Sequence, residues 1–238
     1  MFRHIPNFIT SLNLAAGFIS VIFAFNGDLA NASWFILAAM IFDFLDGFTA
    51  RLLKAYSDIG KELDSLADVV SFGVAPAAIM YQLINGSLPE SVPAFVRFIT
   101  VIMPVCAALR LAKFNIDPSQ TVSFKGLPTP ASALAVISVV IAHQYSDSRL
   151  IESFAGSTAA LAIFLITVSL LMVTRIPLLS LKMHDLKFRG NEGRYILITS
   201  VILALAVFGI AGATLIIPLY IIVSLFSPLP GKPLIVNH

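Results

Sequence analysis

The chain has 238 residues, of which 58% are hydrophobic and only 12% are charged. Soluble domains average roughly 45–50% apolar and about 25% charged residues, so this composition excludes an ordinary soluble domain and indicates a helical membrane protein. The net charge is +2, and the sequence contains no basic-aromatic patch and no zinc-binding spacing, so nucleic acid is not expected as a partner. Cys106 is the single cysteine, which excludes an internal disulfide.

Apolar stretches long enough to cross the roughly 30 Å hydrocarbon core of a bilayer follow one another along the chain. They fall at 8–26, 32–53, 62–84, 93–112, 130–145, 154–174, 195–209 and 212–228. The sequence therefore predicts an all-α integral membrane protein, a polytopic bundle of about eight transmembrane helices that forms a single domain over residues 1–238. The last two stretches are short and closely spaced, and we expect additional C-terminal helices over 195–228, as a tight hairpin or a re-entrant pair.

The placement of positive charge predicts the orientation of these helices. If the N-terminus is cytoplasmic, then every lysine and arginine except Arg97 and Arg149 falls on the cytoplasmic side, which is thirteen of the fifteen. This bias matches the positive-inside rule for an even number of spans, with both termini in the cytoplasm. Arg3, the apolar run after it and Ala30-x-Ala32 also resemble a signal peptide, but its removal would break the alternation. We therefore expect a prokaryotic inner-membrane protein that keeps this segment.

The second and third apolar stretches carry four aspartates near the turn that joins them. Asp43 and Asp46 are three residues apart, and Asp64 and Asp68 are four apart, so each pair shares a helix face. The full pattern from 43 to 68 is D-x2-D-G-x2-A-R-x8-G-x3-D-x3-D. A carboxylate inside a membrane costs about 2.5–3.5 kcal/mol, so four of them need compensating cations. Two antiparallel helices can direct all four into one cavity near the cytoplasmic face.

These features predict a site where two divalent cations act on a phosphate group. Carboxylate oxygens accept both Mg²⁺ and Mn²⁺, and two ions about 3.5–4 Å apart suit an in-line displacement at phosphorus. Gly47 and Ala50 leave room for a bulky ligand close to the backbone, and the planar guanidinium of Arg51 can hold a phosphate. An ion-coupled transporter would spread polar residues through the bilayer, and a non-catalytic scaffold would not need four acids, so both alternatives are less favoured.

The pattern over 43–68 resembles the signature of the CDP-alcohol phosphotransferases, membrane enzymes that build phospholipid head groups. The resemblance implies that Asp43, Asp46, Asp64 and Asp68 bind two metal ions, and that Asp68 is also the general base for an attacking hydroxyl. It further implies a CDP-lipid pocket that contains Gly47, Ala50, Arg51, Ser57, Gly60 and Asn7. For Asn7, capping of the first helix is an alternative interpretation.

Three more stretches, at 68–77, 109–115 and 124–131, make the chain most similar to the membrane-embedded (type II) phosphatidylserine synthases. The resemblance implies transfer of the phosphatidyl group from CDP-diacylglycerol to L-serine, which gives phosphatidylserine and CMP. Other acceptors of the same chemistry stay open, namely glycerol phosphate, an inositol phosphate and choline, as does an ether-lipid donor that would give archaetidylserine.

A serine pocket needs cationic groups beside the metal ions, because serine carries a carboxylate. The candidates near the cytoplasmic face are Arg110, Lys113, Asn115 and Lys125. The positive-inside rule alone also accounts for the three cations among them. Membrane lipids are the expected surroundings, and a homodimer is compatible with the resemblance.

Overall fold

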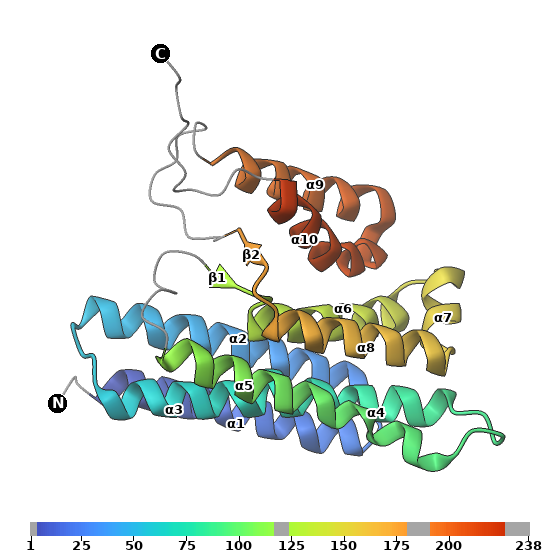
Figure 1. Ribbon diagram of the computed structural model, residues 1–238, viewed down its shortest axis with the longest axis horizontal. Helices are drawn as coiled ribbons and strands as arrows, with labels where there is room; N and C mark the ends of the chain where they lie inside the picture. Colours follow the sequence, from blue (N-terminus) through green and yellow to red (C-terminus); the bar gives the residue numbers. More distant parts are fainter. Residues whose placement is uncertain (1–3, 117–123, 180–190, 227–238) are drawn as a thin grey trace.

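The computed structural model describes residues 4–116, 124–179 and 191–226, and nearly all of these residues are helical. The α-helices are α1 (Ile5–Phe25), α2 (Leu29–Leu52), α3 (Asp58–Asp68), α4 (Ala75–Ser87), α5 (Ile102–Ile116), α6 (Thr129–Tyr145), α7 (Arg149–Ala155), α8 (Thr158–Val173), α9 (Glu192–Phe208) and α10 (Ile216–Phe226). A π-helical turn, Val69–Val74, joins α3 to α4, and 3₁₀ segments precede α5 (Ala94–Val101) and α10 (Gly209–Leu215). The long helices lie side by side along the long axis of the molecule (Figure 1).

Four helical segments among the described residues are long and apolar enough to cross a membrane: Ile5–Phe25, Asp58–Ser87, Ala94–Ile116 and Glu192–Phe226. The pair α7 and α8 becomes a fifth if its two bent parts count as one span. Over the described residues, each of the apolar stretches expected from the sequence is helical for most of its length, so the all-α membrane architecture is confirmed. The count of eight spans and the cytoplasmic position of the termini stay predictions.

Helices α1 and α2 form a tight hairpin. Gly27 has a φ of 81°, and Asp28 then caps α2 by accepting a 3.0 Å hydrogen bond from the backbone N–H of Asn31. This bond and a second one from the Asn31 side chain hold the pKa of Asp28 below its ordinary value. The buried face of α1 is lined by small and polar residues, which let helices approach closely. They are Thr10, Asn13, Ala16, Gly17, Ser20 and Ala24.

The hydrophobic core lies among α2, α4, α5, α6 and α8. Its largest fully buried side chains are Ile36, Phe72, Ile79, Met80, Ile84, Met103, Leu127, Val136, Ile137, Leu161, Leu165 and Met172. Helix α4 is buried on most of its surface, whereas α1 exposes large apolar side chains such as Phe18 and Ile22. This distribution is expected for a bundle in which the central helix packs against protein and the outer helices face lipid.

A short antiparallel pair, β1 (Phe124–Lys125) and β2 (Pro177–Leu178), ties the start of α6 to the end of α8. The all-α prediction did not include it. Gly126 follows β1 with a φ of 78°, and a Cβ there would stand 2.6 Å from the carbonyl oxygen of Met172. The glycine therefore allows a close backbone approach that fixes where α6 begins.

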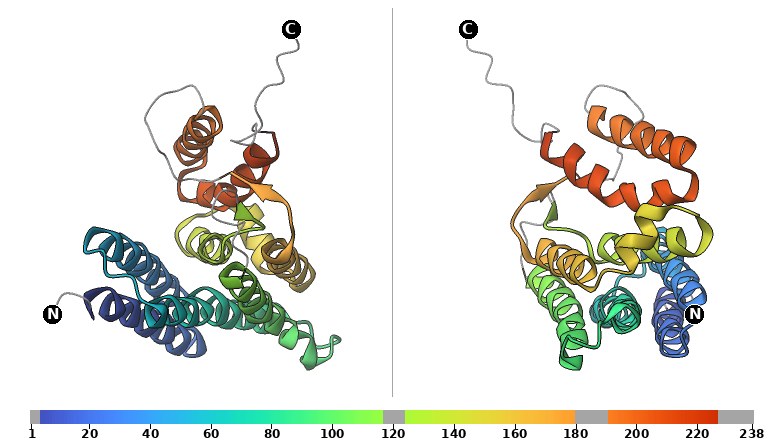
Figure 2. Two further views of the ribbon diagram at one scale, coloured as in Figure 1. Left: turned by 60° about the vertical axis from the view of Figure 1, so that its left-hand side comes forward. Right: turned by 90° about the vertical axis from the view of Figure 1, so that its right-hand side faces the viewer.

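Two predicted spans differ from a simple straight helix. The stretch 154–174 is broken at Gly156, and α7 and α8 meet there at 83°. Ser157 accounts for the new start, because its side chain caps α8 by accepting a hydrogen bond from the Ala160 N–H. The C-terminal helices reverse direction at Gly209, which has a φ of 57°, and α9 and α10 lie side by side as a hairpin (Figure 2).

Candidate active site

The turn between α2 and α3 shapes one end of the site. Lys54 adopts a φ of 49°, and Ala55 is buried, so the chain turns back sharply after α2. Ser57 caps α3, because its hydroxyl accepts a 3.0 Å hydrogen bond from the Gly60 N–H. The two aspartate-bearing helices are thereby held antiparallel, with their acidic faces toward each other.

Three of the four predicted aspartates form a compact cluster. Asp43, Asp64 and Asp68 each place a carboxylate oxygen within 4.8 Å of the others. Asp46 does not belong to this group, but it is buried beside it, with 6% of its surface exposed, and Asp68 is similarly buried at 7%. The structure thus brings three of the four aspartates close enough to share a metal ion and places the fourth, Asp46, next to them.

The cluster fits a divalent cation. Asp46 Oδ2 and Asp64 Oδ1 are buried and have no hydrogen-bond partner among the described residues. Buried carboxylates that repel one another and lack donors are unfavourable unless cations compensate them. Oxygen-only ligands of this kind are those that Mg²⁺ and Mn²⁺ prefer. The geometry supports metal binding by Asp43, Asp64 and Asp68, and Asp46 is buried nearby.

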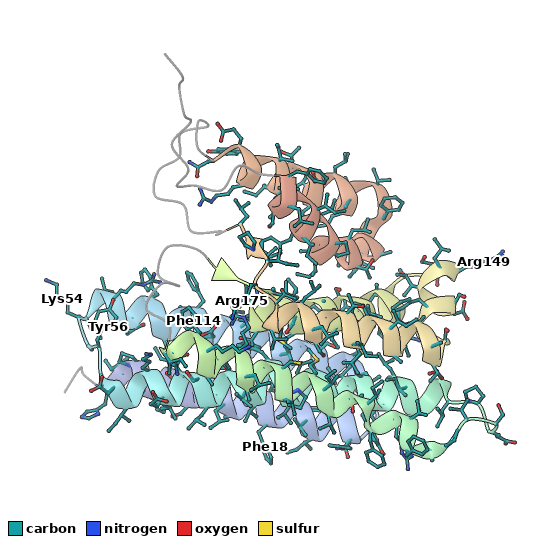
Figure 3. The ribbon with its side chains drawn as sticks, viewed as in Figure 1. Phe18, Lys54, Tyr56, Phe114, Arg149 and Arg175 are labelled. Atoms are coloured by element: carbon teal, nitrogen blue, oxygen red, sulfur yellow. The ribbon has the colours of Figure 1, made fainter. Side chains whose placement is uncertain are left out.

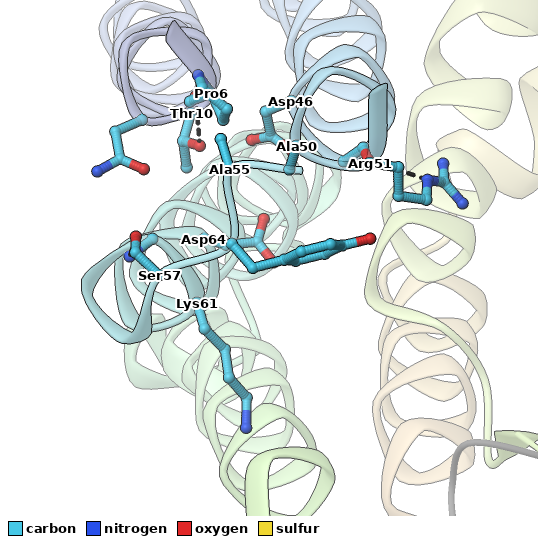
Figure 4. Close-up of a pocket in the computed structure, with 13 residues that line it drawn as sticks. Pro6, Thr10, Asp46, Ala50, Arg51, Ala55, Ser57, Lys61 and Asp64 are labelled. Atoms are coloured by element: carbon cyan, nitrogen blue, oxygen red, sulfur yellow. Dashed lines mark hydrogen bonds between the residues drawn. The ribbon is translucent and has the colours of Figure 1, made fainter. Parts of the chain in front are cut away.

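A cavity of about 420 Å³ adjoins the cluster at the cytoplasmic turn expected from the sequence. Its walls come from the start of α1, the end of α2, the turn and the start of α3 (Figure 4). The lining residues are Pro6, Asn7, Thr10, Asp46, Gly47, Ala50, Arg51, Ala55, Tyr56, Ser57, Gly60, Lys61 and Asp64. All six residues expected to contact a CDP-lipid therefore line one cavity.

The two glycines of the pattern have different surroundings in this cavity. A Cβ on Gly47 would meet nothing within 4 Å, so this position borders open space. A Cβ on Gly60 would stand 2.9 Å from both Asn7 Oδ1 and Ser57 Oγ. A side chain at position 60 would therefore displace the side chains of Asn7 and Ser57, whereas Gly47 keeps the cavity wide.

Arg51 and Asn7 lie at the rim of the cavity. Arg51 Nε donates a 3.0 Å hydrogen bond to the Gly47 carbonyl oxygen, and its guanidinium extends away from the aspartates (Figure 4). Asn7 does not cap α1, because the N-cap residue is His4. Its side-chain oxygen faces Gly60 instead, which favours the pocket interpretation over the capping one.

Of the four residues expected to bind serine, Arg110 lies next to the acids. It is 8% exposed, it interacts electrostatically with Asp68 and Tyr220, and its Nε has no hydrogen-bond partner among the described residues. Lys113 is exposed on α5. Asn115 instead joins α5 to α3, because its Nδ2 donates to Ser65 Oγ at 2.9 Å. The side chain of Lys125 lies outside the described part of the chain.

Several residues of the site were not predicted from the sequence. Asn13 on α1 donates a 3.3 Å hydrogen bond from Nδ2 to Asp68 Oδ1, and it is fully buried. Tyr56 and Lys61 line the cavity, although the Lys61 ammonium turns away to the Asn115 carbonyl oxygen. The signal for Asn13 was present, because it is a polar residue in an apolar span, three positions after Thr10 and six after Asn7.

Comparison with known proteins supplies the chemical context. The CDP-alcohol phosphatidyltransferase family matches residues 3–173 of the chain. A CDP-diacylglycerol–serine O-phosphatidyltransferase of Mycobacterium leprae is 38% identical over 76% of this chain and 59% of its own length. The Bacillus subtilis protein of the same name is 35% identical over 76% of this chain and 93% of its own. An archaetidylserine synthase of Methanothermobacter thermautotrophicus is 32% identical over 74% of this chain and 69% of its own length.

Proposed function

The chain belongs to the CDP-alcohol phosphatidyltransferase family, and we propose that it transfers the phosphatidyl group of CDP-diacylglycerol to L-serine, releasing CMP and phosphatidylserine. One observation carries the proposal. Asp43, Asp64 and Asp68 converge from two facing helices beside a cavity large enough for a nucleotide head group. The serine acceptor is supported by relatives that bear this activity in their names and align with about three quarters of the chain.

Two divalent cations, Mg²⁺ or Mn²⁺, are part of the proposal. Asp43, Asp64 and Asp68 would hold them, together with Asp46. When bound, such cations neutralise charge on the phosphoryl oxygens and on the departing phosphate. The unpartnered carboxylate oxygens support this assignment, because they have no donors in the described part of the chain.

The CDP-lipid is assigned to the cavity at the α2–α3 turn. Gly47 and Ala50 leave space for the head group, and Arg51, Ser57 and Asn7 offer polar contacts around it. Gly60 acts through packing, because it brings Asn7 and Ser57 together. The acyl chains then extend sideways into the bilayer, beside the exposed apolar side chains at the ends of α1 and α2.

Asp68 is assigned as the general base. The serine hydroxyl oxygen forms a bond to the phosphorus that bears the diacylglycerol, while the bond from this phosphorus to CMP breaks. The electron pair leaves with CMP, and the hydroxyl proton passes to Asp68. Arg110 is a cation beside Asp68 and suits the carboxylate of serine. Lys113 is exposed and Asn115 is bonded to Ser65, whereas the side chain of Lys125 lies outside the described part of the chain.

The finer topology belongs to the same proposal. We assign eight spans, both termini and the active site to the cytoplasmic side of a prokaryotic inner membrane, in one domain. The back-and-forth course of the helices and the positions of Lys and Arg support this assignment. A homodimer is part of the expectation for the family and is testable by mass measurement in detergent.

A second candidate function keeps the chemistry and changes the lipid. The similarity to an archaetidylserine synthase favours an ether-linked CDP-lipid as an alternative donor. The head-group cavity would serve either donor, because the two lipids differ in the chains and their linkage and share the CDP moiety.

CMP release by the purified protein tests both candidates. The assay supplies CDP-diacylglycerol or its ether-linked analogue, Mn²⁺ or Mg²⁺, and L-serine, glycerol 3-phosphate, inositol phosphate or choline. We expect release that depends on serine. Release with another alcohol alone would overturn the serine assignment, and no release with any pair of substrates would overturn the transferase assignment.

A further inference from the structure

Asn13 forms the one side-chain hydrogen bond to Asp68 among the described residues. Asn13 has no exposed surface, and its Nδ2 lies 3.3 Å from Asp68 Oδ1. It stands on α1, a helix that carries none of the four aspartates. The general base is therefore contacted by a helix outside the aspartate pattern.

The amide of Asn13 has a defined orientation. An ionised carboxylate only accepts hydrogen bonds, so the NH₂ end of the amide must face Asp68. The other end, Asn13 Oδ1, is buried without a partner among the described residues. A buried amide that is satisfied at one end only is unfavourable for stability. Packing alone therefore does not account for an asparagine at this position.

The backbone around Asn13 is fixed against the turn that follows Asp68. Ser71 Oγ donates a 2.9 Å hydrogen bond to the Asn13 carbonyl oxygen. Ser71 belongs to the π-helical turn Val69–Val74, which begins directly after Asp68. A Cβ on Gly17 would stand 2.2 Å from Ser71 Oγ, so the glycine permits this contact. Short π-helical segments of this kind occur frequently at functional sites.

We propose that Asn13 is a positioning residue that fixes the carboxylate of Asp68. The amide holds Oδ1, which leaves Oδ2 to receive the proton of the attacking hydroxyl. This inference rests on the proposed function, since it assigns Asn13 a role in the same transfer step.

Two substitutions separate positioning from packing. Asn13→Leu removes both ends of the amide at similar volume, and Asn13→Asp keeps the shape but removes the donor. We expect both to lower kcat with serine by about 10- to 100-fold, the effect of one hydrogen bond to a charged group. The KM values for CDP-diacylglycerol and serine should stay within about threefold, because neither substrate is bound by Asn13.

Thermal unfolding without added metal gives a readout that does not depend on turnover. Asn13→Leu should unfold at the same temperature as the wild type or higher, because it removes an unsatisfied buried oxygen. A packing role predicts the opposite pattern, with Asn13→Asp close to wild type in kcat and Asn13→Leu less stable. That pattern, or a kcat for Asn13→Leu within about twofold of wild type, would overturn the proposal.

Asn26→Leu is the matched control, because Asn26 lies exposed at the far end of the same helix. It should change neither kcat nor the unfolding temperature. The wild-type assay separates this proposal from the proposed function. If wild-type protein releases CMP with serine and the Asn13 variants do so equally well, the positioning role is wrong and the function stands. If wild-type protein releases CMP only with another alcohol, the serine assignment is wrong, and the same comparison of variants with that alcohol tests the positioning role.

Discussion

At the scale of single residues, Asp68 differs from the other aspartates in its neighbours. It is the one that Asn13 contacts through a hydrogen bond and Arg110 through its charge. Asp68→Asn keeps the shape of the side chain but removes the proton acceptor. We expect CMP release to fall by about 10²–10⁴-fold, with CDP-lipid binding partly retained. Initial rates and lipid-dependent thermal stabilisation measure the two effects.

Asp58→Asn is the control for this prediction, because Asp58 is exposed at the start of the same helix, α3. It should leave the rate within about twofold of wild type, since loss of one exposed charge near a helix N-terminus has a small effect. Near-normal turnover by Asp68→Asn would exclude Asp68 as the base. The metal-binding prediction for the other aspartates would be unaffected.

The two glycines of the aspartate pattern should respond differently to the same substitution. Gly60→Ala places a methyl group 2.9 Å from Asn7 Oδ1 and Ser57 Oγ, so we expect lower stability, by about 1–3 kcal/mol. Gly47→Ala meets no atom within 4 Å and should fold normally, yet it narrows the cavity. Its KM for CDP-diacylglycerol should rise while its unfolding temperature stays the same or increases, because alanine favours a helix interior more than glycine does. If Gly60→Ala and Gly47→Ala changed the KM and the unfolding temperature by equal amounts, this distinction would be wrong.

The acidic cluster predicts dependence on a divalent cation. A chelator should abolish CMP release, and added Mn²⁺ or Mg²⁺ should restore it. The same ions should raise the unfolding temperature, because they relieve repulsion among buried carboxylates. Asp64→Asn removes a member of the cluster and should weaken this stabilisation. Turnover that persists after complete removal of metal would contradict the assignment of the cluster.

At the scale of elements, two side chains of the C-terminal helix α10 hold it to Leu179, the residue that directly follows β2. Tyr220 donates from its hydroxyl to the Leu179 carbonyl oxygen at 3.0 Å, and Ser224 Oγ accepts from the Leu179 N–H at 3.1 Å. Tyr220→Phe should lower stability by about 1 kcal/mol, which corresponds to roughly 2–4 °C in unfolding temperature. Tyr81→Phe is the control, because Tyr81 contributes ring contacts to Phe25 and Phe98. Equal shifts in the two variants would contradict a docking role for the Tyr220 hydroxyl.

Helices and the acidic pairs could be predicted from the sequence because both depend on local spacing. Asp43 and Asp46, and likewise Asp64 and Asp68, share helix faces whatever the rest of the fold does. The bond from Asn13 could not be predicted, because it depends on how closely α1 approaches α3 and the π-helical turn after it. A polar residue in an apolar span indicates a site but does not name its partner.

The irregular elements were harder to predict for a related reason. The break at Gly156 depends on Ser157 capping a new helix, and hydropathy averaged over a long window does not register one capping residue. The β1–β2 pair joins segments about fifty positions apart in the chain, so no local sequence pattern predicts it. What the sequence predicts well is therefore the helical content and the acidic faces, and what it misses is contact between distant segments.

At the scale of the whole molecule, the two ends of the bundle differ in chemistry. Lys54, in the turn beside the cavity, and Arg149, at the start of α7, lie at opposite ends of the long axis (Figure 3). A second cavity of about 580 Å³ lies at the end opposite the aspartates, lined in part by Asp28, His143 and Glu152. The aspartate cluster therefore lies toward one membrane face, and the orientation of the bundle decides which compartment supplies serine.

Cysteine labelling on intact cells tests that orientation. Cys106 is the only native cysteine and is 5% exposed, so Cys106→Ser provides a background without thiols. Into it we would place Lys54→Cys or Arg149→Cys and add a membrane-impermeant maleimide. Because positive charge favours the cytoplasmic side, Arg149→Cys should react on intact cells and Lys54→Cys only after lysis. The reverse result would place the active site outside, and labelling of both positions from one side would contradict the alternation of the helices.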